Sequence, residues 1–336
     1  MKLLLALTVM FLSGCASVTT KEAQPTPTPA PATTAAPPTL VADVFSRTKV
    51  YWTAGQPATW DDVIKKASEA EVVVIAEQHG HPVGLSAAAA LWRETLKHSK
   101  GKQPALALEF FERDDQSRID DYLAGLSTEE VFLKRTGKTN VAWDGGYPPG
   151  HRDMVEAAKA DHLAVYAANA PRAYVRLART SGYAALERLT PEQQRLFALP
   201  RFAAAGRPPE NRYWRDFLTF MDTTPEKYAA GTVAEREKVD SMFRAESIWD
   251  ATMADTVRKA LADGGGHSPV FLVVGQFHAD YSVWADAGGG TVLALRAVRP
   301  TKVLVVSFQD AEDWRDEDKG RADFVVFCGP RPDKEK

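Results

Sequence analysis

The chain has 336 residues, of which 45% are hydrophobic, and its formal net charge is −3. These values are typical of a globular protein with one large domain or two small ones. The near-neutral charge argues against nucleic acid as the main partner, because phosphate binding requires a strong basic excess.

The first segment, MKLLLALTVMFLSGC, has one lysine, an apolar core and small residues before Cys15. It predicts a secretory signal peptide over residues 1–15 and is too short to cross a bilayer as a transmembrane helix. Its LSGC end resembles the bacterial lipobox, which implies cleavage before Cys15 and lipidation of that cysteine. An ordinary signal peptide cleaved nearby is the alternative. Two or more acyl chains anchor a protein stably to a lipid bilayer.

Residues 16–40 are rich in proline, threonine and alanine without periodicity, which predicts a disordered tether. We expect a single folded domain over residues 41–332. Its one cysteine, Cys328, excludes an internal disulfide and a CxxC metal site. The surrounding FVVFCG predicts a buried, inert thiol.

Continuous apolar runs alternate with helical patterns in the first half of this domain. The patterns predict strands at 71–77, 104–111, 163–169 and 269–275, and helices at 83–98, 114–124, 150–161 and 171–179. This alternation predicts an α/β fold with a mostly parallel central sheet flanked by helices. Three C-terminal runs, TVLALRAV, TKVLVVSFQD and ADFVVFCG, are expected to extend the sheet, with an antiparallel strand at an edge.

The middle of the chain, about residues 180–262, holds no convincing strand and predicts an inserted helical cap. A long helix is expected from Val233 to Ala262, stopped by DGGGHSP. Glu246 lies within its apolar stripe, so its carboxylate either reaches solvent along its stem or points into a cleft.

Polar side chains end each of the four strongest strands. In order along the chain they are Glu77 and His79, Glu109 and Glu112, Asn169, and His278. Ligands of open parallel sheets bind beyond the carboxyl ends of the strands, so these side chains form a candidate site.

Spacing and burial suggest the chemistry of this site. If the strand stays extended, Glu77 and His79 face the same side. Glu109 lies in an apolar run, and burial raises a carboxyl pKa unless a cation or donor compensates. A buried glutamate beside two histidines suits a metal site or a general base. The structural alternative is that a glutamate pairs with Arg172 and that the histidines only hydrogen-bond in a core.

The other histidines fit structural roles better. His81 is expected in the loop after the strand, and His151 near the cap of a helix. His98, His162 and His267 are expected to be solvated. HExxH, GxSxG, Walker and Rossmann motifs are absent from the sequence, and its glycine-rich stretches are interpreted as flexible turns.

Five segments in order resemble the ChaN-like haem-binding lipoproteins, over about residues 45–300. They are IAEQHGH, LALEFFERDDQ, VAWDGGYPPGHRDMVEAAKADHLAVYAANAPR, IWDATMADTV and VVGQFHAD. The family belongs to a wider group with the TIKI and TraB proteins and, more distantly, the erythromycin esterases.

The resemblance assigns family motif positions to residues of this chain. They are Glu77 and His79 (GExH), Glu109 and Gln116, Asn169 and Arg172 (NxPR), Asp250, Met253 and Ala254 (DxxMA), and Gly275 and His278 (GxxH). The chain departs from the family pattern at two places. Ala76 replaces a glycine, and Val83 to Leu91 lacks the further histidines that the family often carries.

The first functional hypothesis, implied by the resemblance, is a lipoprotein that binds haem or iron in haem or iron uptake. Haem iron accepts histidine or tyrosine as an axial ligand. The candidates that bind the cofactor are His79, His278, Tyr147, Tyr281, Asn169 and Arg172. Phe110, Phe111, Trp143 and Trp284 are candidates to cover the porphyrin, although aromatic side chains there also fit an ordinary core.

The second hypothesis is a hydrolase of the TIKI or erythromycin esterase type. Glu77, His79, Glu109 and His278 would then bind a divalent metal such as Zn or Mn and activate water. In a metal-free form the same residues would act catalytically, with His79 as the general base. A third hypothesis is an interaction module whose site has decayed.

The partners and location follow from the lipobox and the resemblance. We expect a lipid bilayer reached through Cys15, haem or another small molecule, an outer-membrane receptor and a homodimer. The expected location is the bacterial outer membrane, lipid-anchored and facing the periplasm or the surface.

Overall fold

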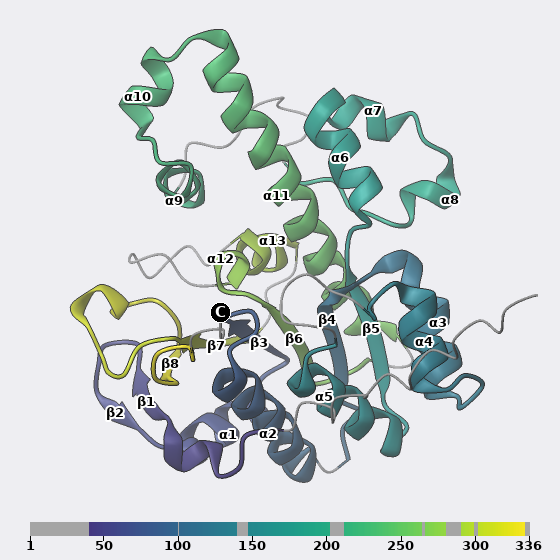
Figure 1. Cartoon of the computed structure of the whole chain (residues 1–336), viewed down its shortest axis with the longest axis vertical. Helices are drawn as coiled ribbons and strands as arrows, with labels where there is room; N and C mark the ends of the chain where they lie inside the picture. Colours follow the sequence, from purple (N-terminus) through teal and green to yellow (C-terminus); the bar gives the residue numbers. More distant parts are fainter. Residues whose placement is uncertain are drawn as a thin grey trace, which may run out of the picture. The chain divides into compact units, whose positions relative to one another are not determined.

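Eight strands form one sheet within the residues that the computed structural model describes, which are 40–99, 101–139, 147–201, 212–263, 266–279, 290–298 and 302–332. The strands are β1 (Lys49–Trp52), β2 (Pro57–Ala58), β3 (Val72–Glu77), β4 (Ala105–Glu112), β5 (Ala164–Asn169), β6 (Val270–Gly275), β7 (Val303–Gln309) and β8 (Phe324–Phe327). Their order across the sheet is β2-β1-β8-β7-β3-β6-β4-β5 (Figure 1).

Helices connect and cover these strands. They are α1 (Trp60–Glu69), α2 (Pro82–His98), α3 (Gln116–Leu123), α4 (Glu129–Thr136), α5 (Pro149–Ala160), α6 (Arg172–Ser181), α7 (Tyr183–Glu187), α8 (Pro191–Gln194), α9 (Arg212–Phe220), α10 (Pro225–Ala230), α11 (Val233–Ala260), α12 (Gln276–Ala279) and α13 (Gly290–Val298). The described residues all fall within one compact unit, Pro38–Lys336.

The predicted α/β class with a mostly parallel central sheet is confirmed. Strands β8, β7, β3, β6, β4 and β5 pair in parallel with one another in this order. The four strongest predicted strands lie within one residue of the observed β3, β4, β5 and β6. Their continuous apolar runs are typical of strands that are buried on both faces.

Two expectations at the sheet's edge were wrong. TVLALRAV forms helix α13, not a strand, and its buried Val292 and Leu295 stand at helical i, i+3 spacing. Leucine and alanine favour the helix, and an apolar run of this length does not distinguish the two structures. The antiparallel edge is made by β1 and β2 instead, whose four and two residues are too short for a periodic signal.

The sheet has helices on both faces (Figure 1). In β3, Val73 and Ile75 point to the face covered by α1, α2 and α5. Val72, Val74 and Ala76 point to the opposite face, where α13 and the C-terminal half of α11 pack. This alternation follows from the two-residue period of a strand. The result is a helix–sheet–helix sandwich.

The described part of the predicted cap contains helices joined by turns and loops, without a strand. Helices α6 and α7 pack on α11 in one apolar cluster, and α9 and α10 pack on it in another. Helix α11 begins with a capping box in which Thr232 and Glu235 exchange side-chain and backbone hydrogen bonds. It ends at Ala260, two residues before the predicted end. One continuous helix therefore runs from the cap to the sheet.

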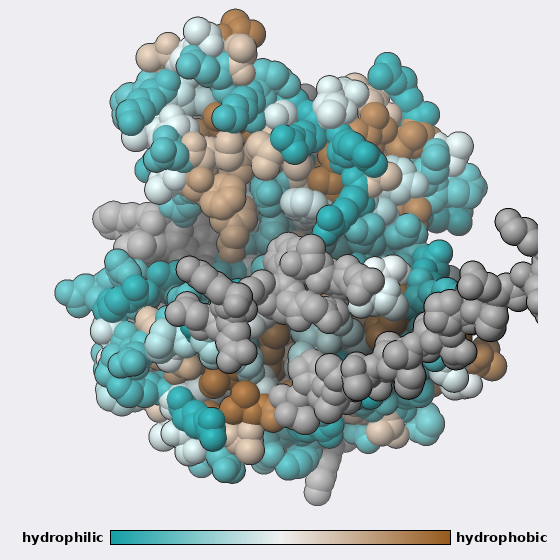
Figure 2. Space-filling view, viewed as in Figure 1, coloured by the Kyte–Doolittle hydropathy of each residue, from teal (hydrophilic) through white to brown (hydrophobic). Residues whose placement is uncertain are grey.

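The surface carries few large apolar side chains. Figure 2 shows a face that is mostly hydrophilic, with small hydrophobic patches, one over α1 and α2 and another over α9 and α11. In the cap region, Phe220 and Val233 are exposed. None of the helices in the described ranges is long and apolar enough to cross a membrane.

Candidate functional site

The three central strands β3, β6 and β4 bring predicted site residues together at their carboxyl ends. Glu77 pairs in register with Gly275, the last residue of β6. Glu109 of β4 accepts a hydrogen bond from the Gly275 backbone N–H at 2.7 Å. His278 follows in α12, with its Nε2 3.8 Å from Glu109 Oε1. Neighbouring parallel strands end at the same edge, so this grouping follows from the topology.

Glu77 is bound by two histidines, one on each carboxylate oxygen. His79 Nδ1 donates to Oε1 at 2.8 Å, and His151 Nε2 donates to Oε2 at 2.7 Å. Strand β3 ends at Glu77, and His79 lies in the turn that follows, which continues through Gly80 at φ +72°. The two side chains therefore meet through a turn and not through an extended strand.

These hydrogen bonds influence the charges of Glu77 and His79. Burial would raise the pKa of Glu77, but the charge and hydrogen bond of His151 and the hydrogen bond of His79 outweigh it and lower the pKa from 4.5 to about 2. Burial opposes a charge on His79, yet its hydrogen bond to Glu77 and the charges of Glu77 and Glu109 raise its pKa. Glu77 is therefore a fixed anion that orients His79.

His278 is the centre of a second group of buried side chains. Its Nδ1 donates to Asp250 Oδ1 at 2.8 Å, and the Thr291 hydroxyl donates to the same oxygen at 2.8 Å. The Tyr213 hydroxyl donates to Asp250 Oδ2. A Cβ at Gly290 would collide with Asp250, so the glycine allows α13 to approach α11 closely. Three elements beyond the sheet thus hold this carboxylate.

The other nitrogen of His278 faces two glutamates without a direct hydrogen bond. Its Nε2 lies 3.7 Å from Glu246 Oε2 and 3.8 Å from Glu109 Oε1. Burial would lower the pKa of His278, but the charge and hydrogen bond of Asp250 and the charges of both glutamates raise it from 6.5 to about 10. Burial raises the pKa of Glu246 from 4.5 to about 7, against the charge of His278. His278 is therefore an imidazolium ion at neutral pH.

The two groups adjoin at Gly275. A Cβ there would stand 2.7 Å from His79 Nε2 and 3.6 Å from Glu109 Oε2. The glycine therefore allows the His79 ring to lie close against the end of β6. The carboxyl edge holds two histidines and two glutamates around this point.

Other predicted residues lie further along the edge. The Asn169 side chain accepts a hydrogen bond from Ala170 N–H, and Arg172 is exposed, 3.4 Å from Glu112. Gln116 braces β5 by bonding Val165 O and Ala167 N. The predicted pairing of a strand-end glutamate with Arg172 occurs, but at Glu112 and not at Glu109.

The aromatic candidates are mostly core. Tyr147 packs against Phe110 and Phe111, and its buried hydroxyl has no hydrogen-bond partner among the described residues. Phe111 is fully buried, whereas Phe110 is partly exposed. Tyr281, Trp143, Trp284 and Cys15 lie outside the described residues.

His151, Tyr213 and Thr291 were not predicted as site residues. His151 was interpreted as cap-related, but α5 is capped by Pro148 without a side-chain hydrogen bond. The sequence did carry a signal for His151. A helix that returns to a parallel strand begins at the carboxyl edge, so a histidine in its first turn faces the site. Glu246, for which two outcomes were open, does not reach solvent but is buried, 3.7 Å from His278 Nε2.

Of the two predicted axial histidines that the structure describes, His79 fits an axial ligand of haem iron and His278 does not. The His79 side chain is 34% exposed, against 9% for His278. A protonated imidazole has no lone pair for iron, which excludes His278 in the charged form. Burial also raises the pKa of Tyr147 well above 10, which disfavours the phenolate that iron would bind.

The predicted metal ligands do not form a metal site in the part of the chain that the structure describes. Among the described residues, no group of three or more His, Cys, Asp or Glu side chains is arranged to hold a metal ion. In particular, Glu77 has both oxygens bonded to histidines, and His278 is held by Asp250.

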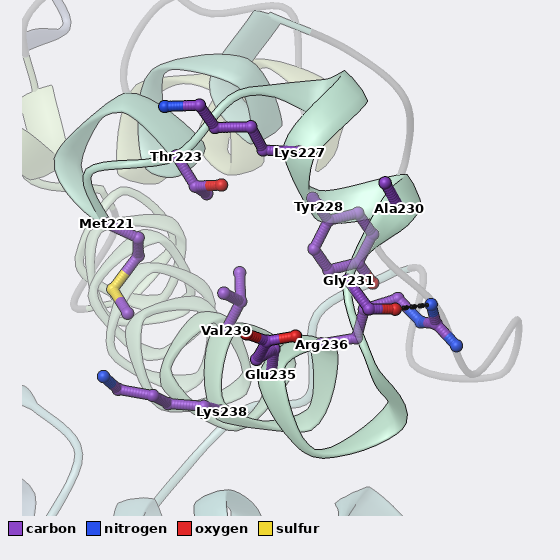
Figure 3. A pocket seen from close by; sticks show the side chains of 10 residues that line it. All are labelled: Met221, Thr223, Lys227, Tyr228, Ala230, Gly231, Glu235, Arg236, Lys238 and Val239. Atoms are coloured by element: carbon purple, nitrogen blue, oxygen red, sulfur yellow. Dashed lines mark hydrogen bonds between the residues drawn. The ribbon is translucent and has the colours of Figure 1, made fainter.

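A separate hollow of about 520 Å³ lies at the far end of the cap, between α9, α10 and the start of α11 (Figure 3). Met221, Val239 and the Tyr228 ring line it, and Lys227 and Lys238 stand at its rim. It contains none of the predicted site residues.

Comparisons with known proteins show the family of the chain and a similar fold. Residues 63–291 match the model of a family described as haem-binding uptake, Tiki superfamily, ChaN. The structure of ChaN of Campylobacter jejuni with cofacial haem binding is similar, with a TM-score of 0.58 and 14% identity, over 83% of this chain and 96% of that chain. At this identity the likeness shows the fold. A variant of erythromycin esterase EreC in its open conformation matches with a TM-score of 0.41 and 13% identity, over 74% of this chain and 72% of that one. No curated protein sequence matches the chain.

Proposed function

The chain belongs to the ChaN family of haem-binding uptake proteins in the Tiki superfamily, and on that premise we propose that it binds haem at the carboxyl edge of its sheet, with His79 as the axial ligand. The observation that carries this proposal is the pairing of a part-exposed His79 with the buried anion Glu77. A histidine that donates its Nδ1 proton to a carboxylate presents Nε2, the more electron-rich nitrogen, to a metal. When bound, haem would supply iron for transport or redox chemistry.

The neighbouring residues support this role for His79. Gly275 allows the His79 ring to approach the end of β6, and Glu109 lies beside the same glycine. Glu77 stays ionised across the physiological pH range because its pKa is about 2. An ionised Glu77 holds the Nδ1 proton of neutral His79, so Nε2 then carries the lone pair that iron requires.

The location of the protein is part of the proposal. Lipid attached to Cys15 and the tether of residues 16–40 would hold the domain at the bacterial outer membrane, where it would take part in haem or iron uptake. The lipobox-like LSGC segment supports the anchor. An outer-membrane receptor and a second copy of the chain are the protein partners that the family resemblance suggests.

A haemin titration of residues 41–336, followed by visible absorption, tests the assignment of His79. We expect saturable binding with a defined stoichiometry. His79→Ala should weaken it more than about 100-fold, because losing a ligand costs more than the 10–100-fold typical of its supporting residues. His98→Ala is the matched control, since His98 is an exposed histidine at the end of α2. Equal affinity of both variants for haemin would contradict the proposal.

A metal-free hydrolase is the second candidate, and one observation favours it. Glu246, with a pKa of about 7, stands beside the charged His278, and perturbed acid–base pairs of this kind are frequent in active sites. The titration separates the two candidates. Turnover of an ester by a protein that shows no saturable haem spectrum would favour the hydrolase and exclude the haem carrier.

A further inference from the structure

The proposal that His79 binds haem gives no role to His151, a buried histidine of the same site. His151 is 3% exposed, and its Nε2 hydrogen bond to Glu77 is as short as the one that Glu77 receives from His79. The three side chains form a continuous series, His151–Glu77–His79, from the interior to the surface. Glu77 and His79 are close in the sequence, whereas His151 joins them from α5 through tertiary structure.

Glu77 needs the second histidine to stay in place. Its side chain is 5% exposed, so each oxygen requires a donor from the protein. Without His151, Oε2 would be a buried anion oxygen without a partner, which is costly. The carboxylate would then turn toward solvent or toward another donor, and its bond to His79 would no longer be fixed.

We infer that His151 is a positioning residue: acting through Glu77, it keeps the proton of His79 on Nδ1 and so leaves Nε2 to meet the ligand. The inference deepens the proposed function and rests on it for the identity of that ligand as haem iron. His151 does not itself touch the ligand in this arrangement, because its ring is almost fully buried and lies edge-on to Phe110.

The surroundings hold His151 rigidly. A Cβ at the preceding Gly150 would collide with the backbone carbonyl of Leu85, so the start of α5 is pressed against α2. Phe110 packs against the ring at a centroid distance of 5.4 Å. A cap role is excluded for the first turn, because Pro148 caps α5 without any side-chain hydrogen bond. Nδ1 of His151 has no partner among the described residues, so the bond to Glu77 is the polar contact that accounts for a histidine here.

The first test uses the protein without haem. NMR of the imidazole nitrogens reports which nitrogen of neutral His79 carries the proton. We expect the Nδ1–H form in the wild type and a mixture of both forms in His151→Phe. His151→Gln, which can still donate to Glu77, should keep the Nδ1–H form, and Glu77→Gln should lose it. An unchanged Nδ1–H form in a folded His151→Phe would overturn the inference.

The second test uses the haem-loaded protein. His151→Phe should weaken haemin binding by about 10–100-fold, the usual effect of removing support behind a metal ligand. It should also raise the reduction potential of the iron, because a less firmly hydrogen-bonded imidazole is a weaker donor. His151→Gln should restore most of the affinity and of the potential. Wild-type values in His151→Phe would contradict the inference.

The two tests keep the inference separate from the proposed function. If His79→Ala binds haemin as well as the wild type, the haem assignment is wrong, whereas the proton position measured without haem still tests His151. If instead the proton position does not depend on His151 while haem binding depends on His79, the inference alone is wrong. Thermal unfolding of each variant checks that it is folded.

Discussion

Two buried glutamates at the same edge of the sheet have opposite electrostatic behaviour, and hydrogen-bond distance explains the difference. Glu77 receives direct hydrogen bonds at 2.7 and 2.8 Å, and its pKa falls to about 2. Glu246 is 8% exposed, but its nearest cation, His278 Nε2, is 3.7 Å away, beyond hydrogen-bond length, and its pKa rises to about 7. Desolvation dominates where a charged partner is near but not in contact.

Glu246→Gln is therefore expected to change stability in a pH-dependent way. The folded-state pKa of Glu246 lies above its ordinary value of 4.5, so the folded protein loses stability as the pH rises from 4.5 through 7. Glutamine stays neutral, so the variant should match the wild type near pH 4.5. Above pH 7 it should be more stable, by up to about 3 kcal/mol.

Urea unfolding at a series of pH values measures this difference. Glu187→Gln is the control, because Glu187 lies in the cap but is exposed. A stability difference between Glu246→Gln and the wild type that stays constant from pH 4.5 to 8 would contradict the expected ionisation of Glu246.

At the scale of elements, the sequence predicts the central strands well because burial on both faces leaves continuous apolar runs. The same topology predicts that Glu77, Glu109 and His278 end at one edge. Edge elements carry weaker patterns, which is why β1 and β2 were missed and α13 was predicted as a strand. The partners of the site residues were harder to predict. Tyr213 reaches the site from a helix whose docking no local pattern specifies, whereas the position of His151 in the first turn of α5 was a signal that went unused.

The docking of α5 on α2 gives a test at this scale. Gly150→Ala would push its Cβ into the Leu85 backbone carbonyl, and backbone cannot move aside as a flexible side chain can. We expect a loss of roughly 1–3 kcal/mol in the free energy of unfolding, the usual cost of overpacking. Displacement of His151 should also weaken haemin binding.

Gly84→Ala, in the first turn of α2, is the matched control. Its added Cβ would meet Cys328 Sγ at 3.6 Å, an ordinary contact. We expect no loss of stability, or a gain of up to about 1 kcal/mol from the better helix propensity of alanine. Equal stability of the two variants in urea unfolding would show that α5 is not closely packed at Gly150.

At the scale of the folded unit, α11 joins the cap to the site. Its N-terminal half packs on α6, α7, α9 and α10, and its C-terminal half covers the sheet. Glu246 and Asp250, near its middle, face His278 at the sheet's edge. Any shift of α11 would therefore change the charges around His278, which links the position of the cap to this part of the carboxyl edge.

The proposed membrane anchor leads to a prediction about the two cysteines of the whole chain, Cys15 and Cys328. Cys328 is buried, and burial raises its pKa to about 12, so it is an inert thiol, as its strand-like context predicted.

Cys15, which lies outside the described residues, follows a lipobox-like LSG. In cells supplied with labelled palmitate, Cys15→Ala should therefore lose both the label and the membrane fraction. Cys328→Ala, the same change at the other cysteine, should keep both, since no reactive thiolate exists at that position. Label retained by Cys15→Ala would rule out lipid attachment at this residue, and the haem-binding domain would then need another route to the membrane.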